Sequence, residues 1–226
     1  MSLSKLEEIR CPCGEAFEAE LWNAINALED PELKEALVGG EINVVCCPSC
    51  NQIFYAEHFI LYQDPSSELL AFVYPSSFAD KADYWEARMA DDFQRAMEEI
   101  APDEKLCYKP ILLFGLDALV EIIHADDAEV DEVAIVEYLA QELGLSLISL
   151  HPSLARPRKL PKLLPRLPVK SGNIREEIIA GLKKVLHRNQ HLEIYKRLLD
   201  SIESDKGWTL EKKLIKSSKR SKDSDR

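Results

Sequence analysis

Two close pairs of cysteines carry the most explicit chemistry in this sequence. Cys11 and Cys13 flank a proline, Cys47 and Cys50 flank a Pro-Ser dipeptide, and residues 14–46 separate the two pairs. Zinc binds four thiolates as a tetrahedron with bonds of about 2.3 Å, which sets neighbouring sulfurs roughly 3.8 Å apart. Short spacings bring two sulfurs this close, so we predict one four-cysteine Zn²⁺ site. Its predicted ligands are Cys11, Cys13, Cys47 and Cys50.

The residues beside each pair favour the tight turns that such a site needs. Pro12 and Pro48 fix a turn dihedral after the first ligand of each pair, and Gly14 can adopt a positive φ after the last. Asn51 holds the corresponding place in the second pair, and asparagine tolerates the left-handed region better than most residues. A closed four-thiolate site has no open position for substrate, so it predicts a structural metal and names no reaction.

Two disulfide bonds are the alternative use of these four thiols. They are typical of small secreted domains, whereas residues 1–10 are polar and charged, unlike a signal peptide, and 226 residues with 46% hydrophobic side chains can bury a core. We therefore expect a cytosolic zinc protein. No apolar run approaches the roughly 18 residues of a membrane span, so we expect no membrane insertion.

Cys46 and Cys107 lie outside the two pairs. Strand alternation turns Cys46 away from Cys47, so we expect it to pack among apolar side chains with Ile42 and Val44. The alternative roles of Cys46 are to replace Cys47 as a ligand or to act as its redox partner. Cys107 is expected to be a structural thiol, because the sequence shows no base that would activate it.

Further blocks of sequence around the cysteines support a family resemblance. In chain order these blocks are Phe17 and Glu18, then Leu21, Trp22 and Asn23, then Asp30-Pro31-Glu32-Leu33-Lys34, Gly40-Glu41-Ile42-Asn43 and Leu61-Tyr62-Gln63-Asp64-Pro65. Over about residues 1–140 the chain resembles the CpXC domain, a prokaryotic family named for its Cys-Pro-X-Cys motif. The resemblance implies a zinc-binding module of bacteria or archaea. The resemblance implies a fold and a bound metal but indicates no reaction.

The hydrophobic pattern predicts an α+β fold. We expect a small antiparallel zinc-ribbon-like sheet with an inserted helix, followed by further helices and a long C-terminal helix. Alternating apolar residues predict strands within residues 5–23, from residue 42, at 52–62 and at 68–75. Helical periods predict helices at Pro31–Val38 with Asp30 as N-cap, at 76–100, at 111–124, and at 129–143 with Asp126 and Asp127 as capping residues.

Four segments follow from these patterns. Residues 1–150 form the predicted zinc-binding α+β domain, and prolines between 152 and 168 predict a Pro-rich basic linker over 151–172, whose leucines favour packing along the body. Asn173 and Glu176 predict the capped start of a long amphipathic helix over 173–206, which can pack on its own body or dimerise, with packing favoured. Residues 207–226 predict a disordered basic tail.

Charge divides the chain into an acidic and a basic part. The net charge is −12, yet residues 1–155 hold 8 Lys and Arg against 31 Asp and Glu, and residues 156–226 hold 20 against 9. The basic part is therefore expected either to fold back on the acidic body or to reach an acidic partner. The acidic body should repel nucleic acid.

These features predict a structural zinc-binding module that acts in macromolecular recognition, through protein contacts of the helices and tail. The partner is not identified by the sequence, and the oligomeric state stays open. One alternative is a nucleic-acid-binding zinc ribbon that uses the basic C-terminal segment, and another is a thiol redox sensor that releases zinc on oxidation. Phosphate-binding glycine loops and GxSxG turns are missing from the sequence, so we do not expect one of the common enzyme classes.

Overall fold

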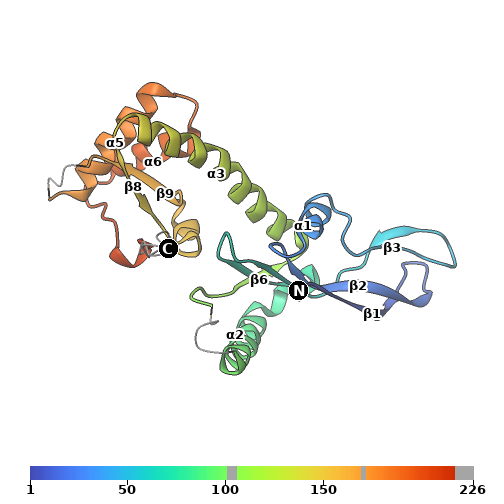
Figure 1. Ribbon diagram of the computed structural model, residues 1–226. Helices are drawn as coiled ribbons and strands as arrows, with labels where there is room; N and C mark the ends of the chain where they lie inside the picture. The colour runs from blue at the N-terminus through green and yellow to red at the C-terminus, as the bar shows by residue number, and fades with distance from the viewer. Residues whose placement is uncertain (101–105, 169–171, 217–226) are drawn as a thin grey trace, which may run out of the picture. The chain divides into compact units, whose positions relative to one another are not determined.

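The chain folds into two compact units with mixed α and β structure, which confirms the predicted α+β class (Figure 1). The computed structural model describes residues 1–100, 106–168 and 172–216. The units are Met1–Ala125 and Asp126–Arg226, so the chain divides earlier than the predicted boundary at residue 150. Across the described ranges, every helix is too short or too polar to cross a bilayer.

The unit Met1–Ala125 is built on a five-stranded sheet of order β1-β2-β5-β6-β7. Its strands are β1 (Leu3–Arg10), β2 (Ala16–Asn26), β5 (Ile60–Asp64), β6 (Leu69–Tyr74) and β7 (Ile111–Phe114). The sheet is mixed, because β2 pairs with β5 and β6 pairs with β7 in parallel, whereas a small antiparallel sheet was predicted. Parallel neighbours require crossover connections, and the segments after β2 and after β6 supply them.

Both faces of this sheet are covered at its central strand β6. The strand β6 is buried along its whole length, with Leu69, Ala71 and Val73 in one apolar cluster and Leu70, Phe72 and Tyr74 in another. The first cluster packs against α1 (Pro31–Val38) and the first turns of α3 (Leu116–Glu142). The second packs against α2 (Ala82–Glu99), which follows the 3₁₀ turn η1 (Ser76–Lys81). In Figure 1, α1 and α2 accordingly lie on opposite sides of the strands.

Two predicted elements of this unit differ from the structure in detail. The predicted strand 52–62 is two strands, because β4 (Ile53–Tyr55) pairs with β3 (Val44–Cys46) in a separate hairpin and β5 joins the main sheet. The bounds of α1 match the prediction, but the Asp30 carboxylate does not cap the helix and instead accepts a hydrogen bond from the backbone N–H of Ser2.

The two helices predicted at 111–124 and 129–143 are a single helix preceded by a strand, so the prediction was wrong in type only for residues 111–114 and wrong in number. Residues 111–114 form β7, Gly115 turns the chain at φ +80°, and α3 then runs unbroken to Glu142. Its sequence contains no glycine or proline, so nothing local ends it near Asp126 and Asp127. Both aspartates therefore lie within the helix and not at a cap.

The predicted linker 151–172 is instead part of the unit Asp126–Arg226. It holds α4 (Pro152–Ala155), the 3₁₀ turn η2 (Arg156–Arg158) and β9 (Leu163–Arg166), which pairs with β8 (Ser146–Ser149). Leu164 is fully buried and Leu160 and Leu163 pack beside it, as the leucine pattern predicted. Residues 169–171 of that prediction lie outside the described residues.

The predicted helix 173–206 is two helices, α5 (Ile174–Arg188) and α6 (Glu193–Ser204). Asn173 caps α5 as predicted, by accepting a hydrogen bond from the Glu176 N–H. The chain becomes extended at Asn189, and the Glu132 carboxylate then accepts bonds from the N–H groups of Glu193 and Ile194, which caps a second helix. The apolar faces of both helices are buried in the unit's own core, which confirms packing over dimerisation for this segment.

The start of the predicted tail is folded as well. Leu214 is buried in the 3₁₀ turn η3 (Lys212–Leu214), and Ile215 forms a β-bridge with Leu150. Disorder was therefore the wrong prediction for residues 207–216, whereas residues 217–226 lie outside the described part. Basic side chains of this unit pair with its acids, as in Arg156–Asp126 at 2.7 Å and Arg188–Glu142 at 2.6 Å. The basic segment thus folds back on acidic residues of its own chain.

Candidate metal centre

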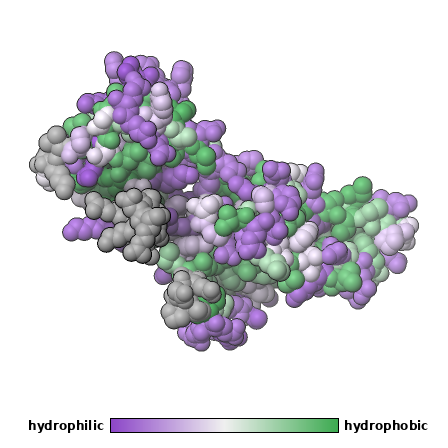
Figure 2. All heavy atoms as spheres, viewed as in Figure 1, coloured by the Kyte–Doolittle hydropathy of each residue, from purple (hydrophilic) through white to green (hydrophobic). Residues whose placement is uncertain are grey.

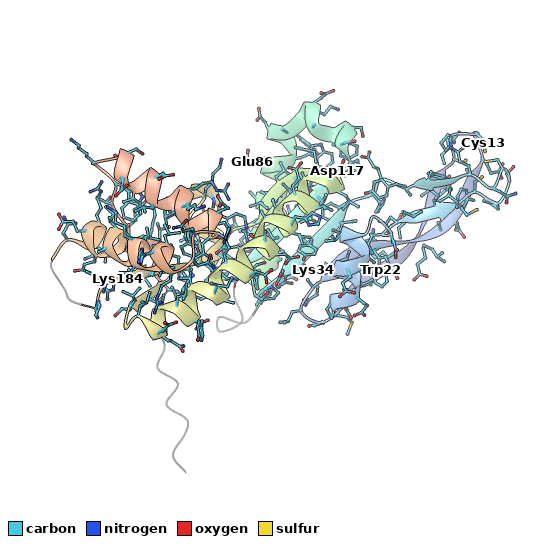
Figure 3. The ribbon with its side chains drawn as sticks, turned by 90° about the horizontal axis from the view of Figure 1, so that it is seen from above. Cys13, Trp22, Lys34, Glu86, Asp117 and Lys184 are labelled. Atoms are coloured by element: carbon cyan, nitrogen blue, oxygen red, sulfur yellow. The ribbon has the colours of Figure 1, made fainter. Side chains whose placement is uncertain are left out.

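The two cysteine pairs occupy the turns of two hairpins. Cys11 and Cys13 lie in the turn that joins β1 to β2, and Cys47 and Cys50 lie in the turn that joins β3 to β4. Figure 3 shows Cys13 at the far end of the β1–β2 hairpin, with further sulfur atoms beside it, and Trp22 closer to the centre of the five-stranded sheet. We call β1, β2, β3 and β4 together the hairpin pair.

The four sulfurs converge on one point. Cys11 Sγ lies 3.6 Å from Cys50 Sγ, and Cys13 Sγ lies 3.9 Å from Cys47 Sγ, so each close contact joins one hairpin to the other. All four sulfurs lie within 4.8 Å of one another. The spacing of roughly 3.8 Å in a tetrahedral thiolate site falls between the two contact distances. The structure thus brings together the four cysteines that the sequence singled out, in an arrangement that could hold a metal ion.

Both turns have the backbone that the sequence predicted. Gly14 adopts φ +99° and its N–H donates to the Cys11 carbonyl at 2.8 Å. Asn51 adopts φ +57° and its N–H donates to the Cys47 carbonyl at 2.9 Å. The left-handed residue after each pair lets the chain reverse at once, so both sulfurs of a pair point to the same side.

Burial and backbone amides act differently on the individual thiols. Burial raises the pKa of Cys11 to about 12, despite the opposing effect of the Cys13 N–H. Burial also opposes ionisation of Cys47, but the N–H groups of Cys50 and Ser49 outweigh it and lower its pKa to about 7. The Gln52 N–H lowers the pKa of Cys50, yet burial and the Cys13 thiol leave that pKa raised. A metal ion must therefore displace protons from Cys11 and Cys50 at neutral pH.

Asn43 joins the second hairpin to the first. Its side-chain oxygen accepts from the Trp22 N–H at 2.7 Å, and its side-chain amide donates to the Trp22 carbonyl at 3.1 Å. Its own carbonyl accepts from the Ala56 N–H, its side chain is buried, and its φ is +58°. The Asn43 side chain thus pairs with the backbone N–H and carbonyl of Trp22 in β2, as the backbone of a neighbouring strand would. The sequence analysis named Asn43 within a family block but assigned it no role. Its positive φ, which is uncommon for a non-glycine residue, is visible only in the structure.

One aromatic contact joins the hairpins between Asn43 and the cysteines. Phe17 of β2 meets Phe54 of β4 edge to face, with ring centroids 6.4 Å apart. Such a pair contributes roughly 1 kcal/mol beyond the area it buries. The hairpin pair is therefore held by a polar clamp at one end, a single ring pair in the middle and the four sulfurs at the tip.

The remaining two cysteines lie outside the cluster. Cys46 is exposed, so the predicted packing among apolar side chains was wrong, and its thiol approaches only the Cys47 carbonyl, at 3.9 Å. Alternation along β3 does separate Cys46 from Cys47, which is buried in the four-cysteine cluster. Cys107, predicted to be a structural thiol, is also exposed.

Comparison with known proteins supplies one match. Residues 9–138 match the family model described as CpXC protein, and this segment contains all four clustered cysteines and ends within α3. Searches of curated proteins and of solved structures gave no match.

Proposed function

The chain belongs to the CpXC protein family, whose model matches more than half of its length, and we propose that it carries one structural zinc ion. The ligands in this proposal are Cys11, Cys13, Cys47 and Cys50. The observation that supports this most is the convergence of four thiols from two separate turns at tetrahedral spacing. Soft thiolate sets select zinc, iron or copper(I) over magnesium and calcium, and a four-sulfur tetrahedron is typical of zinc.

The role of the ion in this proposal is architectural. Bound zinc supplies a cross-link between two turns, and such sites commonly contribute on the order of 10 kcal/mol or more to folding. Little else joins the two hairpins near the sulfurs, where their contacts are the Phe17–Phe54 ring pair and the hydrogen bonds of Asn43 to Trp22. The backbone N–H groups of Ser49, Cys50 and Gln52 face the sulfurs and offset their negative charge. The zinc centre thus fixes a surface that can recognise another protein.

Charge argues against the nucleic-acid alternative. Glu8 lies directly opposite Glu18 in the β1–β2 ladder, close to the cysteine turn, and Glu20 lies opposite Leu6 on the same face. An acidic strand face beside a thiolate site repels phosphate. The C-terminal basic residues are in part neutralised within their own unit, as in the pairs Arg158–Glu211 and Lys183–Glu203. Protein recognition is the better-supported reading.

The test is the metal content of protein purified without chelators. We expect about one zinc per chain in the wild type and a loss of most of it in Cys47→Ser, because three thiolates and a hydroxyl bind zinc far more weakly. The matched control is Cys46→Ser, one residue away and outside the cluster, which should keep its zinc. Well under one zinc per wild-type chain, or equal zinc in both variants, would contradict the proposal.

The same samples test the redox alternative. Mild peroxide should leave zinc in place if the site is purely structural, whereas a redox sensor would lose zinc and gain a disulfide bond among these cysteines.

A further inference from the structure

The β3–β4 hairpin is apolar on both of its faces. Its register pairs Val44 with Tyr55, Val45 with Phe54 and Cys46 with Ile53. Residues paired across two strands point to the same face, and alternate residues along a strand point to opposite faces. Val45 and Phe54 therefore face the β1–β2 hairpin, where Phe54 meets Phe17. The other face carries Val44, Cys46, Ile53 and Tyr55, and we call it the outer hairpin face.

This outer hairpin face is open to solvent. Ile53 is 69% exposed, Val44 42% and Tyr55 37%, and Cys46 is exposed as well. Figure 2 shows apolar residues at the surface of the end of this unit that carries the hairpin pair. Single exposed apolar residues are common, but a two-stranded sheet with one wet face normally alternates apolar with polar residues. Apolar residues on both faces are the pattern of strands that are covered on both sides.

Charge is missing from the same stretch. Residues 42–56 contain no Asp, Glu, Lys, Arg or His, and this is the longest run without Asp, Glu, Lys or Arg in a chain that is 30% charged. The next longest such runs supply buried residues, since 69–79 contains the fully buried β6 and 143–155 contains buried Ile148, Leu150 and Ala155. The outer hairpin face thus has the composition of a core and the exposure of a surface, which is typical of the centre of a protein interface.

We propose that the outer hairpin face is a homodimer interface, covered by the same face of a second copy of this chain. The inference rests on the zinc module proposed above, because the loop that joins the two strands is the Cys47–Cys50 turn. Two copies with a net charge of −12 repel each other, so they can meet closely only where like charges are absent. The four side chains of the outer hairpin face are uncharged and meet that condition, with the charges of Glu57 and Asp117 acting only at its edge, on Tyr55.

The shape of this face suits contact with itself. One strand carries the smaller side chains, Val44 and Cys46, and the other carries the larger ones, Ile53 and Tyr55. A two-fold axis between the strands sets the smaller row of each copy against the larger row of the other, which lets the two faces interlock. A single hairpin is narrow beside a standard interface of about 800 Å² per partner, so we expect a dissociation constant of about micromolar order.

The first test is the mass of the zinc-loaded full-length chain by sedimentation velocity, from ~1 to ~100 µM. The wild type should shift from monomer to dimer over this range, and Ile53→Glu should weaken the dimer at least tenfold by burying an unpaired charge. The matched control is Leu28→Glu after β2, a position that is 64% exposed, where the same charge is added outside this face. This control should dimerise like the wild type.

The second test uses the thiol at the centre of the face. In a zinc-loaded Cys107→Ser background, Cys46 is the exposed thiol outside the cluster, and the two-fold contact brings it near Cys46 of the second copy. A short bismaleimide should then produce a covalent dimer that disappears in Cys46→Ser. This cross-linking result tests the dimer interface even if Ile53→Glu loses its zinc.

The outcomes separate the two proposals. A wild type that carries one zinc and stays monomeric to ~100 µM overturns the dimer and leaves the zinc module standing. A dimer that Ile53→Glu does not weaken, with zinc retained, places the interface elsewhere and overturns it too. A wild type without zinc contradicts the module itself, whichever mass is found.

Discussion

The hairpin pair and the unit Asp126–Arg226 are stabilised in different ways. The C-terminal unit buries a continuous cluster of aliphatic side chains and Tyr195 among α3, α5, α6 and the β8–β9 hairpin, and its sequence contains no cysteine. The hairpin pair buries few large side chains but holds four converging thiols. Where helices supply a core, no cross-link is needed, and where short strands cannot, the metal ion proposed above would take the place of the core.

The largest expected effect is the response to metal removal. Chelation should release the Cys47–Cys50 turn and open the β3–β4 hairpin, since about 10 kcal/mol of metal-binding energy is lost. Hydrogen–deuterium exchange should rise by orders of magnitude in peptides covering residues 8–18 and 44–55. Peptides from α5 and α6 should exchange as before. An equal rise in both regions, or none, would remove the distinction between them.

The second effect is the pH dependence of zinc binding. The pKa of Cys11 is raised to about 12 and that of Cys50 is raised, so both thiols keep their protons at pH 7 and zinc must displace them. Each displaced proton changes affinity tenfold per pH unit, so acidification from pH 8 to 7 should weaken binding at least ~100-fold. Competition with a chromophoric chelator at several pH values measures this slope. A slope of one proton or fewer would contradict these pKa shifts.

The third effect is a loss of stability in the unit Asp126–Arg226 that leaves the hairpin pair unchanged. A Cβ added at Gly181 of α5 would lie 2.5 Å from the Pro165 carbonyl oxygen of β9 and 2.7 Å from its carbon. Since both atoms are backbone, Gly181→Ala should force α5 and β9 apart and lower the free energy of unfolding of this unit by about 3 kcal/mol. Its zinc content should not change.

Gly207→Ala is the control for that variant. The nearest atom to its added Cβ is the Asp205 side-chain oxygen at 3.3 Å, which can move aside. Thermal unfolding of zinc-loaded protein compares the two variants. Equal stability in both would mean that the α5–β9 contact is not tight.

The smallest effect concerns the polar clamp between the hairpins. Asn43→Ala removes two hydrogen bonds and leaves the N–H and carbonyl of Trp22 without these partners, at a cost of about 2 kcal/mol to the hairpin pair. Zinc affinity should fall because the two turns are held together less firmly, while α5 and α6 stay unchanged. Chelator competition measures the affinity. Asn43→Gly relieves the positive φ and should lose less, so equal affinity in wild type and both variants would contradict the clamp.

Sequence reasoning succeeded where the signal was local. The bounds of α1, the positive φ of Gly14 and Asn51 and the convergence of four cysteines follow from proline, glycine and cysteine positions alone. The Asn173 cap and the apolar faces of α5 and α6 were local signals as well. Side-chain alternation separated Cys46 from Cys47, but it could not tell which face another part of the chain would cover.

Sequence reasoning failed where contacts with distant residues decide the structure. Residues 111–114 fit a helical period, yet they pair with β6, and a short buried run cannot be assigned from periodicity alone. The break between α5 and α6 begins at Asn189, whose side-chain oxygen accepts from the His191 N–H, but the cap of α6 comes from Glu132, which lies far away in sequence. The prolines at 152–168 suggested a spacer, but two of them sit in η2 and β9, where the chain needs no amide donor from them. Such contacts leave no mark within the segment itself.

The central claim is that the four sulfurs bind one metal ion that joins the two hairpins. X-ray absorption at the zinc edge, on protein purified without added metal, tests it most directly. We expect one zinc per chain surrounded by four sulfurs at about 2.3 Å, with no nitrogen or oxygen ligand. A sulfur count below four, or an edge signal far short of one zinc per chain, would contradict it.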